Sequence, residues 1–173
     1  MSTVASFAPI ARADARVLVL GSMPGVASLQ AQRYYAHPHN HFWSFMGQLV
    51  GAGPSLPYPQ RLNRLMDAGI ALWDVLAECE RAGSLDSAIR AVRRNDLAGF
   101  FATHAGVRWV LFNGTKAEVE FARLRLDDVV VRDLEFSRLP STSPANARQS
   151  ADLKLRMWRD RLEMAGVKLT SGD

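Results

Sequence analysis

The stretch Val17-Leu18-Val19-Leu20-Gly21-Ser22-Met23-Pro24-Gly25 decides the fold class. Its four apolar residues form a short run that ends at a glycine, which is the pattern of a strand buried on both faces. The five residues that follow predict a loop, because glycine and proline set special backbone angles. A buried strand leaving through such a loop favours an α/β protein with a parallel sheet.

Strand and helix patterns alternate along the rest of the chain. Further strands are predicted at 70–76, 108–112, 129–131 and 136–139. Helices are predicted at 42–49, 61–68, 84–92, 95–104, 115–124 and 150–165, together with a short helix capped by Ser28. Thr115 is expected to cap its helix, and the last helix is expected to turn Leu153, Met157, Trp158 and Leu162 inward. The sequence therefore predicts one α/β domain over residues 1–173, with a mainly parallel sheet.

Composition narrows the class of protein. A single cysteine, Cys79, excludes an internal disulfide, a cysteine-rich zinc site and an iron–sulfur cluster. No apolar run reaches membrane-spanning length and the N-terminus lacks a signal-peptide pattern, so a cytoplasmic protein is expected. The net charge of +4 comes mostly from arginine, which binds phosphate better than lysine does. This weakly favours a polyanionic partner.

Three unusual loops follow predicted strands, at 21–40, 113–114 and 140–146. In open parallel sheets ligands bind beyond the carboxyl ends of the strands. We therefore expect the three loops to meet at one crevice. The segment 34–43 is the richest in aromatic and histidine side chains and holds the main candidate residues.

Chemistry alone leaves two interpretations for several of these residues. Tyr35 offers a flat face for a base but could equally be a core aromatic. Asn40 could orient water, cap the next helix, or do both. Asn113 could pair with a base edge or belong to an Asn-Gly turn. Asp74 could touch the ligand or cap a strand, and the run Arg90, Arg93 and Arg94 is expected to be a solvated helix face.

Three histidines in the same segment, His37, His39 and His41, suggest a metal site at first sight. Pro38 interrupts them, and no acidic or cysteine ligand lies nearby in the sequence. No metal is therefore expected. A phosphate contact is the alternative for a histidine here.

At these loops the sequence resembles the uracil-DNA glycosylase superfamily, most closely its hypoxanthine-DNA glycosylase branch and next the mismatch-specific uracil glycosylases. The matching pieces, in the family's order, are residues 21–25, 35–43, 109–114 and 139–144. The resemblance implies a three-layer αβα fold with a four-stranded, mainly parallel sheet. It also implies a monomer that acts on damaged DNA without metal or cofactor.

The resemblance implies roles for particular residues. Asn40 would be catalytic; it replaces the carboxylate or amide that many members carry where Met23 stands. The base would be held by Gly21, Ser22, Met23, Pro24, Tyr35 and Asn113, with Tyr35 stacking on it. DNA would be contacted by His37, Ser141, Thr142, Ser143, Ala145, Asn146 and Arg148.

The function expected from the sequence is removal of hypoxanthine or uracil from DNA by a monofunctional glycosylase in base excision repair. These loops hold no lysine to form a Schiff base, so strand cleavage is not expected. Two alternatives stay open. One is a hydrolase or transferase of free nucleosides or nucleotides. The other is a DNA-binding homologue that has lost catalysis, which Met23 favours.

Overall fold

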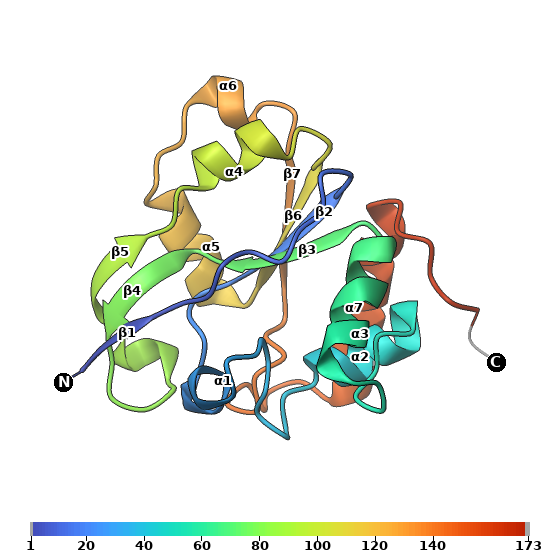
Figure 1. The fold of residues 1–173 in the computed structure, drawn as a ribbon, viewed down its shortest axis with the longest axis horizontal. Coiled ribbons are helices and arrows are strands. Elements are labelled where there is room, and N and C mark those ends of the chain that lie inside the picture. Colours follow the sequence, from blue (N-terminus) through green and yellow to red (C-terminus); the bar gives the residue numbers. More distant parts are fainter. Residues whose placement is uncertain (1, 172–173) are drawn as a thin grey trace.

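The computed structural model describes residues 2–171 and contains two sheets (Figure 1). The larger is parallel, with strand order β3-β2-β6-β7. Its strands are β2 (Val17–Gly21), β3 (Ile70–Asp74), β6 (Trp109–Asn113) and β7 (Glu135–Leu139). The smaller is antiparallel, in the order β1-β4-β5, and consists of β1 (Thr3–Ala5), β4 (Leu76–Glu80) and β5 (Arg90–Arg94). The predicted four-stranded parallel sheet is confirmed.

Helices cover both faces of the parallel sheet (Figure 1). One face carries α2 (Phe42–Val50), α3 (Tyr58–Asp67) and α7 (Ala151–Met164). The other carries α4 (Leu97–Thr103) and α5 (Thr115–Ala122). The remaining helical turns are α1 (Val26–Ala31), the 3-10 turn Asp86–Ala88 and α6 (Asp128–Val131). Within the described residues, no helix has the length and apolar character needed to cross a membrane.

Strand β2 shows why these residues form a buried central strand. Val17 and Val19 pack with the helices α2, α3 and α7, whereas Leu18 and Leu20 pack with α4 and α5. Successive side chains of a strand point to opposite faces, so an unbroken apolar run serves two cores at once. The strand ends at Gly21, where the first of the three loops, 21–40, begins.

The chain passes directly from the large sheet into the small one. β3 ends at Asp74, and β4 begins at Leu76. Only Val75, which is fully buried, separates the two strands. Asp74 therefore lies at a junction between the sheets, at the carboxyl end of the parallel sheet.

The helix predicted at 84–92 is wrong. Residues Asp86–Ala88 form a single 3-10 turn, and Arg90–Arg94 form β5. β5 pairs with β4, and Arg93 forms an ion pair with Glu78 across that pairing. Sheet pairing with a strand that the sequence did not reveal has overridden the local helical pattern.

The strand predicted at 129–131 is also wrong, because these valines lie in the helical turn α6. β6 already has β2 on one side and β7 on the other, so the sheet has no place for this segment beside it. Val129 is 73% exposed, which shows that its β-branched side chain has no core to enter.

Helix ends follow the predictions only in part. Asp96 accepts a hydrogen bond from the backbone N–H of Gly99, and Ser150 accepts one from that of Leu153, as N-caps do. Ser28 is not a cap: it lies inside α1, and its hydroxyl accepts the N–H of Ala36. Thr115 is the first residue of α5, whose cap is Gly114 with φ +94°.

The inward face of α7 also differs from the prediction. Trp158 and Leu162 are buried as expected, but Leu153 is 38% exposed. The fully buried neighbour is Lys154, whose role is described below.

Candidate active site

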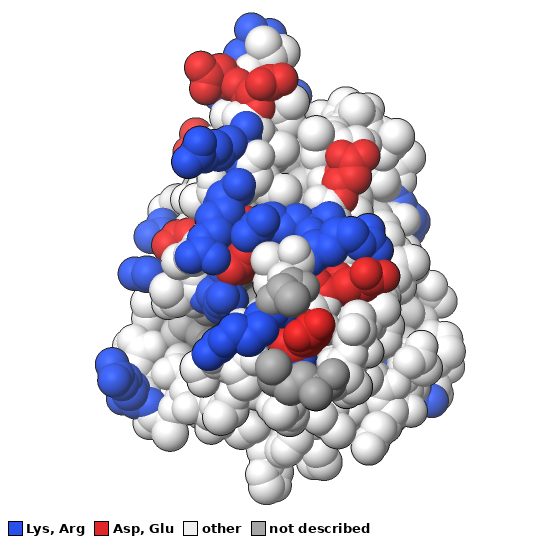
Figure 2. Space-filling view, turned by 90° about the vertical axis from the view of Figure 1, so that its left-hand side faces the viewer, with Lys and Arg blue, Asp and Glu red and all other residues white. Residues whose placement is uncertain are grey.

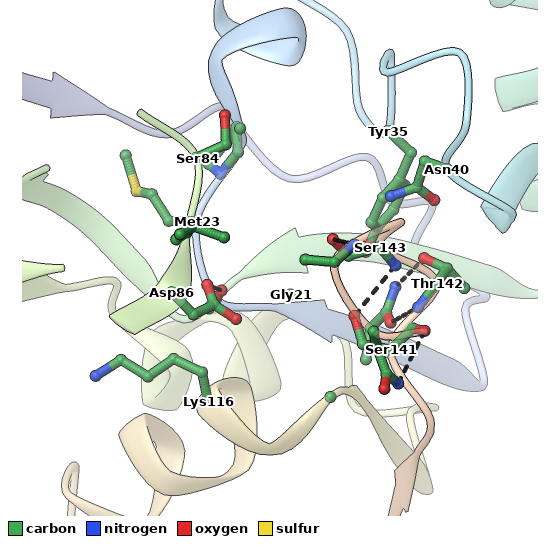
Figure 3. A pocket seen from close by; sticks show the side chains of 18 of the residues that line it. Gly21, Met23, Tyr35, Asn40, Ser84, Asp86, Lys116, Ser141, Thr142 and Ser143 are labelled. Atoms are coloured by element: carbon green, nitrogen blue, oxygen red, sulfur yellow. Dashed lines mark hydrogen bonds between the residues drawn. The ribbon is translucent and has the colours of Figure 1, made fainter. Parts of the chain in front are cut away.

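One cavity of about 1,180 Å³ lies beyond the carboxyl ends of the parallel strands. The three loops predicted to meet do so here, and the segment 84–90 of the small sheet adds a wall that was not foreseen. Of the predicted site residues, the cavity is lined by Gly21, Ser22, Met23, Pro24, Tyr35, His37, Asn40, Asn113, Ser141, Thr142, Ser143, Ala145 and Asn146. Arg148 is exposed and lies outside the lining. Figure 3 shows Tyr35, Asn40 and Thr142 across the cavity from Met23, Ser84 and Asp86.

The first loop is braced from behind. The Ser22 hydroxyl donates to Asp86 at 2.6 Å, and the buried guanidinium of Arg81 donates to the carbonyl oxygen of Pro24. Met23 is 7% exposed and packs with Leu76 and other residues of the small sheet. The Met23 side chain thus holds this loop onto the small sheet, and no polar group of it can hold a water.

Asn113 and Thr142 form a closed pair of hydrogen bonds. The Asn113 amide nitrogen donates to the Thr142 hydroxyl at 2.9 Å, and the Thr142 N–H donates to the Asn113 amide oxygen at 2.9 Å. Both ends of the amide are engaged, so Asn113 joins β6 to the loop 140–146. For this amide to read a base edge, as the sequence predicts, the base would have to share it with Thr142.

Lys154 holds the same loop from inside the protein. Its ammonium group donates to the carbonyl oxygen of Ser141 at 3.0 Å and to that of Asn146. The side chain is 1% exposed, and burial lowers its pKa below the ordinary value. The sequence did not single out this residue, because a lysine on a surface helix gives no sign of being buried.

Replacing Lys154 with methionine is expected to loosen the loop, because two buried carbonyl oxygens lose their donor. Each unsatisfied group costs about 1–3 kcal/mol, so the free energy of unfolding should fall by at least that much. A loss of about 1.4 kcal/mol of binding free energy weakens affinity tenfold. We therefore expect the KM for a damaged duplex to rise about tenfold. Lys168→Met, at an exposed position, is the control and should change neither quantity. Equal behaviour of the two variants would contradict the anchoring role.

Asn40 lies at the entrance to α2. Its amide oxygen accepts the N–H of Phe42 at 2.9 Å, but the N-cap of α2 is His41, so Asn40 braces the turn before the helix and is not its cap. The next residue, His41, donates its N–H to the carbonyl oxygen of Thr142, which ties this segment to the loop 140–146. An amide oxygen has a second lone pair and the amide nitrogen carries two hydrogens. Asn40 can therefore brace the start of the helix and still hold a water in the cavity.

Tyr35 stands between the core and the cavity. One ring face stacks on the fully buried Phe42, with centroids 4.1 Å apart and planes at 27°. The residue has φ +52°, an uncommon value for a non-glycine residue that marks a constrained position. The opposite ring face is the one that a base can meet. Tyr34, by contrast, is buried and donates its hydroxyl to Ala8, which is a structural role.

The deep end of the cavity holds two polar groups without partners. The Tyr35 hydroxyl and the Oδ2 atom of Asp74 are buried, and no described group meets hydrogen-bonding geometry with either, although the nearby Asn113 side chain offsets part of the rise in the pKa of Tyr35. Both lie close to Gly21: a Cβ added there would collide with Oδ1 of Asp74 and come within 3.4 Å of the Tyr35 hydroxyl. Glycine at this position leaves room for the two groups. Buried polar groups are normally paired, so these two point to a ligand.

Burial raises the pKa of Asp74 to about 7, and the negative charge of Asp86 acts in the same direction. Arg81 partly offsets the rise in this pKa. Burial, and then the charge of Asp74, also raise the pKa of the Tyr35 phenol. The sequence placed Asp74 at the correct edge of the sheet but left its role open, because its isolation from partners depends on the folded chain.

The histidines do not converge. The ring of His37 accepts the N–H of His39 through Nδ1, whereas His41 stacks on Phe45 with the ring planes at 8°. Within residues 2–171, no group of three histidine, cysteine or acidic side chains is placed to hold a metal ion. Of the three, His37 lines the cavity.

Basic side chains surround part of the site. Figure 2 shows lysine and arginine gathered in a band across the side of the molecule that carries β1, β4 and β5, with fewer acidic groups among them. Arg90 and Arg138 are exposed and line the cavity. Arg94 is not the free surface charge that was expected, since it forms an ion pair at 2.6 Å with the fully buried Glu120.

Comparisons with known proteins agree with this architecture. The profile of the uracil DNA glycosylase superfamily matches residues 8–162. A hypoxanthine DNA glycosylase of Methanosarcina acetivorans is 36% identical over 138 residues, which cover 79% of this chain and 84% of the relative. One of Methanosarcina barkeri is 35% identical over 112 residues, covering 64% and 71%.

A solved structure extends the agreement to three dimensions. A candidate uracil DNA glycosylase from Methanosarcina acetivorans, determined by solution NMR, superposes with a TM-score of 0.80 at 30% identity. The superposition covers 95% of this chain and 99% of the other. Profile, relatives and fold agree, and the chain belongs to the uracil DNA glycosylase superfamily.

Proposed function

We propose that the protein is a monofunctional DNA glycosylase that flips a deaminated base, hypoxanthine or uracil, out of DNA and hydrolyses its N-glycosidic bond. Family membership and the names of both relatives support DNA glycosylase activity in base excision repair. Damaged DNA is then the substrate. We also propose that the protein acts as a monomer, as the family resemblance implies.

The unpartnered pair at the deep end of the cavity carries this proposal. Hypoxanthine and uracil both present a carbonyl oxygen next to an N–H. A neutral Asp74 carboxyl can donate to the carbonyl and accept from the N–H. The Tyr35 hydroxyl lies near this carboxyl, beside Gly21, and it is the Tyr35 ring that would meet the base. Oδ2 of Asp74 and the Tyr35 hydroxyl lack partners among the described residues, as do Nε and Nη1 of the buried Arg81.

The aromatic wall supports the same substrate class. A base that leaves the duplex loses its stacking, at a cost of about a few kcal/mol that is smaller for mispaired bases. Tyr35, fixed against Phe42, can return roughly 1–3 kcal/mol by stacking on the base. Deaminated bases pair less well than the bases from which they derive, which favours their extrusion.

Hydrolysis needs a positioned water and a stabilised leaving group. The bond between the anomeric carbon and the base nitrogen breaks, and its electron pair leaves with the base. The water held by Asn40 adds its oxygen to the anomeric carbon and releases a proton. Asn40 is neutral, so it orients the water and does not strongly deprotonate it.

We expect no strand cleavage, because a lysine that lines the cavity is held in an ion pair. The loops 21–40, 113–114 and 140–146 contain no lysine. Lys116, in the first turn of α5, nevertheless lines the cavity. Its ammonium group lies 2.9 Å from the fully buried carboxylate of Glu120. An amine must be free to attack the sugar, and this one is engaged in the ion pair with Glu120.

The test uses labelled duplexes that carry one deoxyinosine, one uracil or no damage, followed by hot alkali. We expect cleavage of the damaged strand only, and only after alkali. Cleavage before alkali would contradict the monofunctional assignment. Release of hypoxanthine from free deoxyinosine but not from DNA would replace the proposal by a nucleoside hydrolase. Tight binding of damaged duplex without base release would replace it by a binding protein.

A further inference from the structure

A second hollow, of about 320 Å³, lies on the other side of the segment 34–40. It is bounded by the end of α1, by the start of α3 and by Trp43 of α2. Tyr34, Tyr35, His37 and Asn40 line both the hollow and the large cavity. The segment that carries the catalytic candidate is therefore a wall common to the two sites.

Two arginines meet over one aromatic ring in this hollow. The guanidinium carbon of Arg33 lies 5.3 Å from the centre of the Tyr58 ring, and that of Arg61 lies 5.7 Å from it. Arg61 also lies 5.2 Å from the centre of the Trp43 ring. Guanidinium groups stack well on aromatic faces, so the rings fix where the two charges sit.

The platform beneath the arginines is rigid. The Tyr58 hydroxyl accepts the N–H of Tyr34, and the Trp43 indole donates to the Tyr34 carbonyl oxygen at 2.9 Å. Arg61 donates its Nε–H to the carbonyl oxygen of Leu56 at 2.9 Å, which fixes its side chain. One edge of its guanidinium is thus used, and the two terminal nitrogens remain for another acceptor.

The positive charges are not neutralised by the protein. Among the described residues, no carboxylate lies within 4 Å of either guanidinium, although Arg12, Arg93, Arg94 and Arg123 all have such partners. Burial and the charge of Arg33 lower the pKa of Arg61, which shows that the two cations oppose each other. Arg33 is exposed, so an anion can reach the pair from solvent.

We propose that Arg33 and Arg61 form a phosphodiester site that grips the backbone of the damaged strand beside the flipped nucleotide. This inference rests on the proposed function. The shared wall places the site next to the cavity that would hold the base, and a strand entering that cavity carries a phosphate at every nucleotide. The planar guanidinium fork matches the geometry of phosphate oxygens.

A phosphate held here would also act on the catalytic segment. Phosphate contacts fix the register of a protein on DNA without reading its sequence. The grip would therefore position Tyr35 and Asn40 over any lesion and would strengthen binding more than it changes the chemical step. This separates the site from the base pocket, where changes should alter the choice of base.

The test measures binding of a duplex containing deoxyinosine at several salt concentrations. Arg33→Gln and Arg61→Gln should each weaken binding about three- to tenfold near 0.1 M salt. Each should also reduce the slope of log affinity against log salt by about one, the value for one lost phosphate contact. The single-turnover excision rate at saturating enzyme should fall by a smaller factor than the affinity does, because the site acts mainly on binding.

The matched control is Arg64→Gln, an exposed arginine one turn further along α3 and outside the hollow. It should leave the salt slope unchanged. An equal effect of Arg64→Gln and Arg61→Gln would show that Arg33 and Arg61 act only as general surface charge, and would overturn the proposal. Arg33→Gln removes an exposed side chain, so its result stands even if Arg61→Gln unfolds. Thermal unfolding of each variant checks this.

Inorganic phosphate distinguishes a DNA site from a free-anion site. If the pair binds a DNA phosphodiester, millimolar phosphate should compete with duplex binding in the wild type and less so in the double variant. Binding of phosphate with no change in duplex affinity on mutation would assign the site to a free anion and overturn the proposal. If the wild type excised no base but the variants showed reduced salt slopes, the phosphate site would be upheld and the proposed function would fail. If the wild type excised the base but the variants kept its salt slope, the proposed function would be upheld and the phosphate site would fail.

Discussion

Replacing Asn40 with alanine is expected to lower single-turnover excision of a deaminated base by about 100-fold or more, in the range typical for a lost positioning or electrostatic group. The amide is the cavity-lining group best suited to hold the attacking water, since Met23 in the first loop has no polar atom for this purpose. Duplex affinity should change little, because the proposed role of Asn40 is to hold the water and not to bind the phosphates. Rates measured on a deoxyinosine duplex, with enzyme in excess, check the expectation.

The helix-start role of Asn40 must be separated from the catalytic one. Alanine also removes the acceptor for the Phe42 N–H, at a cost of about 1 kcal/mol of stability. Asn40→Ser keeps a side-chain acceptor for the Phe42 N–H but is too short to make this bond and hold the water together. We expect serine to recover the thermal midpoint but not the rate. Recovery of both would show that Asn40 serves the helix alone.

The sequence could predict the fold because local pattern and tertiary role agree along the central strand. Each residue of Val17–Leu20 is apolar, and each is buried on one or the other face of the sheet. The sequence could also predict that the loops after β2, β6 and β7 meet, because the carboxyl ends of parallel strands lie at one edge of a sheet. The resemblance then supplied roles that loop chemistry alone left open.

The rest of the site depends on contacts between distant residues. Asn113 and Thr142 are 29 residues apart, and neither shows in the sequence that the other occupies its side chain. Lys154 is buried because two loop carbonyls face it, not because of any helical periodicity. The segment 84–90 was predicted as helix, so Asp86 and its hydrogen bond with Ser22 could not be foreseen. Arg33 and Arg61 come together only because both approach the ring of Tyr58.

Asp74 gives the second large effect, a loss of activity as the pH rises through about 7. The pKa of its carboxyl is raised to about 7, so the group is neutral below this pH and ionised above it. The neutral form can donate to a base carbonyl, whereas the ionised form can only accept and repels the negative charge that grows on the departing base. Excision by the wild type should fall up to about tenfold per pH unit above the transition, as the neutral fraction falls.

The same group should make the fold less stable at high pH. In the unfolded chain the pKa of Asp74 returns to its ordinary 3.8, so between about pH 4 and 7 the folded state binds more protons. Stability must then decrease as the pH rises through this window, by at most about 4 kcal/mol for a shift of roughly three units, and stay level above it. Thermal unfolding of the wild type and of Asp74→Asn at pH 4.5 and 8 measures this: the variant should be the more stable of the two at pH 8 and similar at pH 4.5.

Asp74→Asn joins both measurements in one experiment. An amide keeps a donor and an acceptor at every pH, so the variant should excise deoxyinosine at a rate that no longer falls between pH 7 and 8.5. Asp133→Asn, which removes an exposed carboxylate, should leave the wild-type profile unchanged. If Asp74→Asn retained the wild-type pH profile, the titrating group would lie elsewhere and Asp74 would not read the base. If its profile became flat while the thermal midpoint at pH 8 did not rise, the carboxyl would act on the base without being strained by its burial.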